Sequence, residues 1–489
     1  MISLVDYFSS PSQKKLDLAK VLSFPLTEVP LSLCHITGTV NKTDKSSLMK
    51  KLEGMGQMNT EPSCVDVYII DAMFFLRTLV DIPSNFGQLA RLILQKAISF
   101  ARTVHIVCDT YKEGPSIKAH VHEERGDTEV QYTITGPSQK RPADFNKALL
   151  SSAFKTALLR FLQVEWKSAS YSDILTEHTV YFAIDDVCFR YSIEHGKYVC
   201  QEVPELRSQH EEADTRIVFH ADFVEKEQQS KTIAVRSCDT DVFILLIHHA
   251  MNMEASIWMD TGLSARNNRR HINVTDLAST LTPPVCASLP SFHAFTGCDY
   301  TAAFLRKAKT RPYALMISNE KYISAFIELG SSEIVEPTVC DVLEDFVCSM
   351  YGAHGEADVN SARLSIFKKM YSPPNKNSPL AKIKTADACC LPPCKNALYL
   401  KIKRANYVAR MWKGARNSNP TTSTPQGHGW ALSEENSLEF VWYTCPKTPD
   451  LFGKDTEEDH EHDDVGEDDD EENPNCIVSS DEESDDNLA

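Results

Sequence analysis

The sequence predicts an α/β fold: a doubly wound, mostly parallel sheet flanked by helices, with a helical C-terminal module and a disordered acidic tail. Short apolar runs rich in β-branched residues recur between Val65 and Asp260, and amphipathic segments separate them. Strands that alternate with helices are typical of a parallel sheet covered on both faces. The end of the chain is too charged and too poor in apolar side chains to fold.

Five apolar runs are expected to form the strands, and four of them end in Asp. They are VDVYIID (65–71), TVHIVCD (103–109), TVYFAID (179–185), KTIAVRS (231–237) and ASIWMD (255–260). Helices are predicted for the amphipathic segments 86–100, 145–161, 211–225 and 241–251. The order strand, helix, strand indicates a doubly wound arrangement.

The remaining segments have other textures. Residues 1–62 show no sustained periodicity and are interpreted as an N-terminal extension of unknown role, ahead of an α/β domain over 63–311. We expect a helical extension over 312–378 and a C-terminal module with a basic and aromatic helix over 379–453. Residues 454–489 are predicted to be a disordered acidic tail.

The formal net charge of −18 lies in the tail, because the chain from Asp455 onward holds 18 Asp and Glu residues and no Lys or Arg. The rest is formally neutral, so the overall acidity does not exclude a nucleic-acid partner. The 15 Cys residues, mostly single within apolar runs, favour reduced thiols. No run approaches the roughly 20 apolar residues that span a bilayer. We therefore expect an intracellular protein, nuclear or cytoplasmic, without a membrane partner.

Seven carboxylates lie where predicted strands and helices meet. Two of them end the first two strands, and ligands of doubly wound sheets bind at the carboxyl ends of strands. Acidic pairs follow in HEEADTRI and SCDTDVFILL, and one further Asp stands in FTGCDY. The set is Asp71, Asp109, Glu212, Asp214, Asp239, Asp241 and Asp299.

Converging carboxylates repel one another and are tolerated only if cations neutralise them. Hard oxygen ligands select Mg²⁺ or Mn²⁺, and two such ions about 4 Å apart are suited to displacement at phosphorus. We expect the first four carboxylates of the set to hold one ion and the last three to hold a second. The alternative is that these acids cap helices or complement helix dipoles, as strand-end Asp residues commonly do.

In order and context these motifs resemble the flap endonuclease and XPG-type branch of the PIN-like nucleases. The motifs read IIDAM, IVCDTY, EEAD, SCDTDV and GCDY, and they cover about Val65 to Lys309. The resemblance implies a PIN-like nuclease domain over 63–311 that uses two Mg²⁺ or Mn²⁺ ions on DNA or RNA. The chain is also similar to a group of animal proteins that share HEEADTR, DTDV, HAFTGCD and GHGW, a lineage distinct from the repair enzymes.

The resemblance further implies two cations that face the scissile phosphate. The family places a Lys after an apolar residue downstream of the second Asp and an Arg seven positions later, which here are Lys118, after Ile117, and Arg125. A solvent-exposed helix face explains this charged stretch equally well. The glycine-rich hairpin with which the family grips duplex phosphates has no G-x-G counterpart in GCDYTAAFLRKAKTRP.

The C-terminal module contains a basic helix interleaved with aromatic residues. Its side chains would suit contacts with a nucleic-acid backbone and stacking on bases. An amphipathic helix that packs its aromatic side chains on the core explains the pattern equally well. The candidate residues are Lys401, Lys403, Arg404, Arg410 and Trp412.

Together these patterns predict a metal-dependent phosphodiesterase that cleaves DNA or RNA by a two-metal-ion mechanism. The alternative is a catalytically inactive PIN-like scaffold, derived from a mobile element, that binds nucleic acid or protein partners. The acidic tail would bind basic proteins or screen the groove of the nuclease itself.

Overall fold

The computed structural model describes residues 17–56, 61–110, 115–117, 131–370, 388–420 and 423–449. All of them belong to one compact unit, Met1–Pro449. Residues 450–489, which include the predicted acidic tail, lie outside the described residues. Among the described helices, none combines the length and the apolar character needed to cross a membrane.

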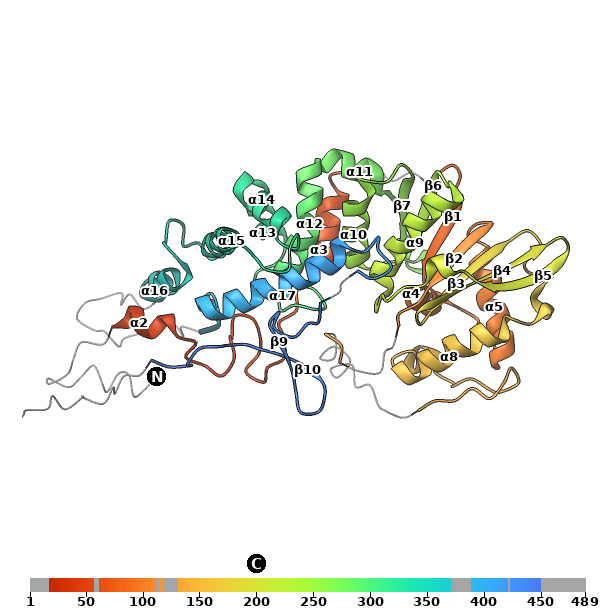
Figure 1. The fold of residues 1–489 in the computed structure, drawn as a ribbon, viewed down its shortest axis with the longest axis horizontal. Helices are drawn as coiled ribbons and strands as arrows, with labels where there is room; N and C mark the ends of the chain where they lie inside the picture. Colours follow the sequence, from red (N-terminus) through yellow and green to blue (C-terminus); the bar gives the residue numbers. More distant parts are fainter. Residues whose placement is uncertain are drawn as a thin grey trace, which may run out of the picture. The chain divides into compact units, whose positions relative to one another are not determined.

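An eight-stranded sheet with the order β5-β4-β3-β2-β1-β6-β7-β8 forms the centre of the α/β region (Figure 1). The five predicted runs correspond to β1, β2, β3, β6 and β7, which pair in parallel. The predicted α/β fold with a mostly parallel sheet is therefore confirmed. The strands are β1 (Val67–Asp71), β2 (Thr103–Val107), β3 (Thr179–Ile184), β4 (Val187–Glu194), β5 (Lys197–Glu202), β6 (Thr232–Arg236), β7 (Ser256–Thr261) and β8 (Arg270–Asn273).

Three antiparallel strands at the two edges of the sheet were absent from the prediction. β4 and β5 form a hairpin on β3, and β8 pairs with β7. The hairpin turn holds His195 at φ +50° and Gly196 at φ +73°. A two-residue turn with positive φ at both positions matches the twist of the strands it connects, so this turn sets the register of the hairpin.

The chain winds outward from β1 through β2 and β3, and then returns to β6 and β7 on the other side of β1. This reversal creates a switch point beside β1. Alternate residues of β1 face opposite cores: Val67 and Ile69 pack with one group of helices, and Tyr68 and Ile70 pack with the other. The sheet is therefore covered on both faces.

In the α/β region, four helices pack on the Tyr68 face of the sheet and four pack on the Val67 face, where helices from other parts of the chain join them. The first group is α4 (Ala72–Thr78), α5 (Phe86–Ile98), α7 (Phe145–Ala148) and α8 (Ser152–Glu165). The second is α9 (Ala213–Gln228), α10 (Thr240–Ala250), α11 (Val274–Leu281) and α12 (Pro283–Thr296). The helix predicted over 145–161 is divided because Ser151 starts α8 by accepting a hydrogen bond from Phe154 N.

The helical region expected beyond Pro312 is present, and a long helix follows it. These helices are α13 (Thr310–Ile317), α14 (Glu320–Glu328), α15 (Pro337–Met350), α16 (Val359–Met370) and α17 (Lys395–Lys413). Near the N-terminus lie α2 (Leu18–Ser23) and α3 (Ser46–Glu53), and β9 (Trp430–Leu432) pairs with β10 (Leu438–Phe440).

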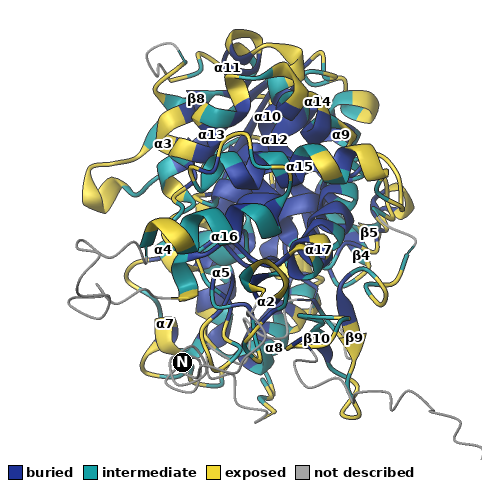
Figure 2. Ribbon diagram, turned by 90° about the vertical axis from the view of Figure 1, so that its left-hand side faces the viewer, coloured by how far each residue is buried: buried dark blue, intermediate teal, exposed yellow. Residues whose placement is uncertain are grey.

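One apolar core joins these outer segments to the α/β region. Leu48 of α3, Phe346 of α15 and Leu398 of α17 belong to the same buried cluster as Phe292 of α12. Figure 2 shows α10 and α12 buried at the centre of this assembly. The N-terminal and C-terminal segments thus pack around α10 and α12 and complete the same core. The predicted segment boundaries themselves stay predictions.

Candidate functional site

Three parallel strands end side by side at the switch point. β1 lies between β2 and β6, with Asp71 opposite Val107 and Ile70 opposite Arg236. Asp71 is the last residue of β1, and Asp109 and Asp239 follow the ends of β2 and β6 by two and three residues. The crevice at such a switch point is where doubly wound sheets bind ligands.

Asp71 is held by two hydrogen bonds. Its Oδ1 accepts from Phe74 N at 3.1 Å, so that it caps α4, and its Oδ2 accepts from Ser237 Oγ at 3.0 Å. Burial, and next the neighbouring charge of Asp109, raise the pKa of Asp71 to about 7. The capping interpretation is thus correct for this residue. The charged form of its carboxyl group is nevertheless disfavoured by burial and by the neighbouring charge of Asp109.

Asp109 connects the end of β2 to the start of α9. Its Oδ1 accepts a hydrogen bond of 2.9 Å from Ala213 N, which lies between Glu212 and Asp214. Thr110 N donates to Glu211 O at 2.7 Å and fixes the same junction. The two acids at the start of α9 are therefore anchored next to the end of β2.

Tyr300 links these acids to the turn that carries Asp299. Its side chain is 1% exposed. Burial, followed by the charges of Glu212 and Asp214, raises the pKa of Tyr300 well above its ordinary value. The start of α9 and the turn after α12 consequently face one another.

The remaining acids come from the start of α10 and from that turn. Asp239 caps α10 by accepting from Asp241 N at 2.8 Å, and burial together with the charge of Asp241 raises the pKa of Asp239. The turn needs Gly297, because its φ is +114° and a Cβ there would lie 2.6 Å from the Cβ of Ala303. Electrostatic interactions thus link the carboxylates in turn: Asp71 with Asp109 and Asp239, and Asp239 with Asp241 and Asp299.

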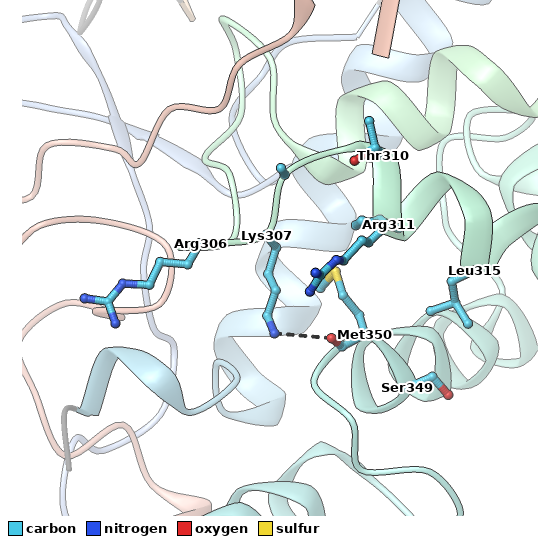
Figure 3. Close-up of a pocket in the computed structure, with 9 residues that line it drawn as sticks. Arg306, Lys307, Thr310, Arg311, Leu315, Ser349 and Met350 are labelled. Carbon is cyan, nitrogen blue, oxygen red and sulfur yellow. Dashed lines mark hydrogen bonds between the residues drawn. The ribbon is translucent and has the colours of Figure 1, made fainter. Parts of the chain in front are cut away.

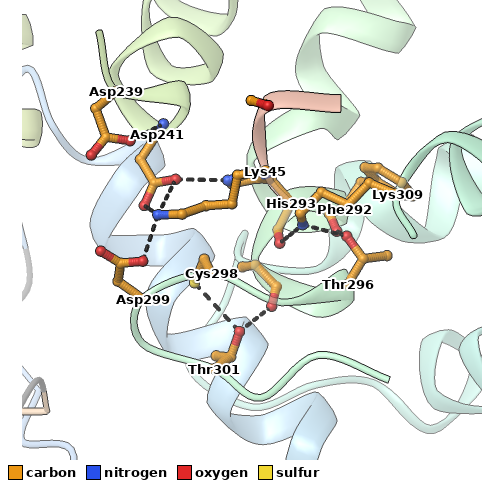
Figure 4. A network of polar contacts seen from close by, with 12 residues as sticks. Lys45, Asp239, Asp241, Phe292, His293, Thr296, Cys298, Asp299, Thr301 and Lys309 are labelled. Atoms are coloured by element: carbon orange, nitrogen blue, oxygen red, sulfur yellow. Dashed lines mark hydrogen bonds and ion pairs between the residues drawn. The ribbon is translucent and has the colours of Figure 1, made fainter. Parts of the chain in front are cut away.

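A lysine that was given no role in the sequence analysis lies against two of these carboxylates (Figure 4). Lys45 Nζ is 3.1 Å and 3.0 Å from the two carboxylate oxygens of Asp241 and 2.5 Å from Asp299 Oδ1. Burial disfavours its charge, but the charges of Asp241, Asp239 and Asp299 outweigh burial and raise the pKa of Lys45. Lys45 is thus a cation at neutral pH.

His293 positions Asp241 from the other side. Its Nε2 is 2.8 Å from Asp241 Oδ1, and its side chain is fully buried. Burial lowers the pKa of His293 to about 4, so its neutral ring donates the proton on Nε2 to the carboxylate. Lys309 Nζ in turn donates to His293 O at 2.9 Å and to Thr296 Oγ1 at 2.7 Å. The sequence analysis gave His293 no role, although its place on the helix that leads into FTGCDY was a usable signal.

The chemistry of the donor set fits a hard divalent cation. All seven predicted ligands are carboxylates, and the pKa values of Asp71 and Asp239 are raised first by burial and next by the charge of a neighbouring carboxylate. Within the described ranges, no three His, Cys, Asp or Glu side chains are grouped in a way that could hold a metal ion.

Three of the residues predicted to bind nucleic acid are instead buried on α17. Lys401, Arg404 and Trp412 are each 1% exposed. Lys401 donates to Ala302 O and lies over the ring of Phe304. Arg404 donates to two backbone carbonyls at 2.9 Å. Buried side chains cannot reach a nucleic acid, and packing on the core explains their pattern.

The other two residues of that set lie nearer the surface. Lys403 and Arg410 are half-buried; Lys403 Nζ donates to Gly427 O and Arg410 Nη1 donates to Ser423 Oγ. Lys118 and Arg125, the two cations that the family resemblance implies, lie outside the described residues.

A cationic cavity of about 450 Å³ follows the turn of Asp299 along the chain (Figure 3). Arg306, Lys307 and Arg311 line it where α13 begins. Lys307 Nζ donates to Met350 O at 3.2 Å, and burial followed by the charge of Arg311 lowers the pKa of Lys307. Among the residues that the structure describes, none of the three cations forms an ion pair with Asp or Glu.

Neither a scan against models of protein families nor a search of curated proteins finds a match for this chain.

Proposed function

We propose that this chain is a divalent-metal-dependent nuclease that hydrolyses phosphodiester bonds of DNA or RNA, related to the flap endonuclease and XPG-type PIN-like nucleases. The observation that supports the proposal is electrostatic: at the switch point Asp71 feels the charges of Asp109 and Asp239, and Asp239 in turn feels those of Asp241 and Asp299. Such a concentration of negative charge is costly unless a cation is bound there.

One ion would be held by Asp71, Asp109, Glu212 and Asp214, which lie nearest the ends of β1 and β2. Asp239, Asp241 and Asp299 would hold a second in the two-ion arrangement. A divalent ion at this position would supply charge for a phosphate oxygen and acidify a water molecule for attack at phosphorus.

The protein's own contribution is to hold these groups in place before substrate arrives. Ser237 Oγ and Phe74 N fix the two oxygens of Asp71, and His293 fixes Asp241. Such preorganisation lowers the cost of reaching the transition state. Lys118 and Arg125 would add positive charge at the phosphate, as the family resemblance implies, and the cavity of Arg306, Lys307 and Arg311 offers cations to a phosphate further along the strand.

The test is a cleavage assay with a charge-neutral double variant, Asp71→Asn with Asp109→Asn. An Asn Oδ1 can still accept the hydrogen bonds from Phe74 N and Ala213 N, so the fold is retained while two charges are removed. The matched control is Asp276→Asn, an exposed acid in the first turn of α11. Labelled single-stranded, flapped and hairpin DNA and RNA are incubated with each protein in Mg²⁺ or Mn²⁺.

Cleavage by the wild type and by Asp276→Asn, with loss of at least about 100-fold in the double variant, supports the proposal. If the wild type cleaves none of these substrates and Mn²⁺ does not raise its melting temperature, the proposal is wrong. The alternative of a catalytically inactive binding scaffold would then stand. One observation favours that alternative: Lys45 already neutralises part of the carboxylate set.

A further inference from the structure

Lys45 reaches the carboxylates from a part of the chain that is far away in sequence. It immediately precedes α3, and 196 positions separate it from Asp241. Its side chain is 21% exposed, that of Asp241 is 1% exposed and that of Asp299 is 26% exposed. The ammonium group therefore sits within the site and not on the open surface (Figure 4).

The segment that delivers Lys45 is firmly anchored. Leu48, Met49 and Leu52 of α3 are buried in the same core as α10. At the end of α3, Glu53 forms a two-point ion pair with Arg270, with N–O distances of 2.5 Å and 2.7 Å. Because Lys45 directly precedes this anchored helix, its backbone is held in one place, unlike that of a lysine on a surface loop.

The same N-terminal segment is also tied to the turn of Asp299. Ala303 N donates to Asn41 O at 2.7 Å, and Leu305 N donates to Ser32 O at 2.8 Å. The approach of Lys45 and the position of Asp299 are thus fixed by one set of backbone hydrogen bonds. The ion pair between them is part of the fold.

The charges around Lys45 match those of a cation site. Two oxygens of Asp241 and one of Asp299 contact its ammonium, and the charge of Asp239 adds to the attraction. His293 Nε2 also contacts Asp241, at 2.8 Å from Oδ1. Lys45 accordingly provides positive charge at the three carboxylates to which the two-ion arrangement assigns its second metal.

We propose that the Lys45 ammonium is a built-in cation that takes the place of the second metal ion, so that this protein binds a single divalent ion. That ion is held by Asp71, Asp109, Glu212 and Asp214, and this part of the inference rests on the proposed function. An ammonium and a divalent cation compete for the same three carboxylates. Removing the charge of Lys45 therefore creates a second divalent site.

The experiment counts Mn²⁺ ions bound to the full chain by titration calorimetry and by the electron paramagnetic resonance of free Mn²⁺. The variants are Lys45→Met, which keeps the length of the side chain without its charge, and Lys45→Arg, which keeps the charge. Lys50→Met on the exposed face of α3 is the control. We expect one ion for the wild type, Lys45→Arg and Lys50→Met, and two for Lys45→Met.

A second measurement follows stability without metal. In EDTA, Lys45→Met removes the ammonium that contacts Asp241 and Asp299, so its melting temperature falls below that of Lys50→Met and recovers when Mn²⁺ is added. If Lys45→Met does not fold, Lys45→Met with Asp299→Asn restores part of the charge balance. This double variant is expected to bind more Mn²⁺ than Asp299→Asn alone.

Two ions bound by the wild type, or one ion bound by both the wild type and Lys45→Met, would falsify the inference. Binding of no Mn²⁺ by any variant would overturn both this inference and the metal site of the proposed function. The two failures can therefore be told apart, because a wild type that cleaves nucleic acid with two bound ions retains the proposed function and lacks only the role of Lys45.

Discussion

At the scale of single residues, Gly297 allows the tight turn that carries Asp299. A side chain at this position would meet Ala303 at 2.6 Å in addition to the strain of φ +114°. We expect Gly297→Ala to destabilise the fold by about 2–4 kcal/mol in urea denaturation. Gly352→Ala is the matched control, since its φ is +77° with no atom within 4 Å of a Cβ, and should cost about 1 kcal/mol. Equal losses would show that close contact is not the reason for Gly297.

A second residue-scale prediction concerns two buried histidines away from the site. Their Nδ1 atoms are 2.9 Å apart, between His105 on β2 and His220 on α9, and both are fully buried. Burial lowers the pKa of His105 to about 3 and that of His220 well below its ordinary value. The unfolded chain therefore binds protons below about pH 6.5 that the folded chain does not bind, and stability falls as the pH falls.

Replacing one of these histidines should weaken that pH dependence. We expect His220→Gln to lower the slope of unfolding free energy against pH by up to about 1.4 kcal/mol per pH unit between pH 6 and pH 4. Urea denaturation across this range measures the slope, with the exposed His354→Gln as control. An unchanged slope in His220→Gln would contradict the buried, neutral state of the pair.

At the scale of elements, the sequence predicted the five central strands because each is a continuous apolar run buried on both faces. It missed β4 and β5, because most of their residues are only partly buried and neither strand is a continuous apolar run, although His195 and Gly196 offered a turn signal. β8 is four residues long and rich in basic side chains, so no periodicity could reveal it.

The same contrast holds for the candidate site. The seven candidate carboxylates could be selected from the sequence because each lies in a local motif: six stand close to the end of a strand or the start of a helix, and Asp299 stands in the turn after α12. Their role as metal ligands stays a prediction. Lys45 could not be selected in this way, because its contact with Asp241 spans 196 positions and depends on how α3 packs against α10. The sequence could not predict the burial of Lys401, Arg404 and Trp412 either. The basic composition of α17 suggests a surface helix, and only its tertiary packing places these side chains in the core.

The start of α13 supports a prediction about nucleic-acid affinity. Arg306→Gln with Arg311→Gln should weaken binding of DNA and RNA regardless of sequence and reduce the dependence of log K on log salt by about 2. Fluorescence anisotropy at several NaCl concentrations measures both. Arg91→Gln with Arg102→Gln is the control, because carboxylates already pair with these two surface arginines. A control that weakens binding equally would argue against the cavity.

At the scale of the whole molecule, the acidic tail should act on the otherwise neutral body through its charge. Removing residues 455–489 takes away 18 acidic side chains and no Lys or Arg. We expect the shortened chain to bind nucleic acid more tightly, with the largest gain at low salt, where screening is weakest. Binding curves at 50 mM and 300 mM NaCl test this, and equal affinities of the two chains at both concentrations would rule out a screening tail.

The shared core of α3, α12 and α17 has a consequence for how the protein is made. During synthesis Lys45 leaves the ribosome long before Asp299, and α17 follows still later. The apolar sides of α10 and α12 therefore stay exposed until α17 has been made and can pack against them. Contacts of such long sequence separation form slowly. The nascent chain is therefore expected to need chaperone protection until about residue 413 has emerged, and expression at low temperature should favour correctly assembled protein.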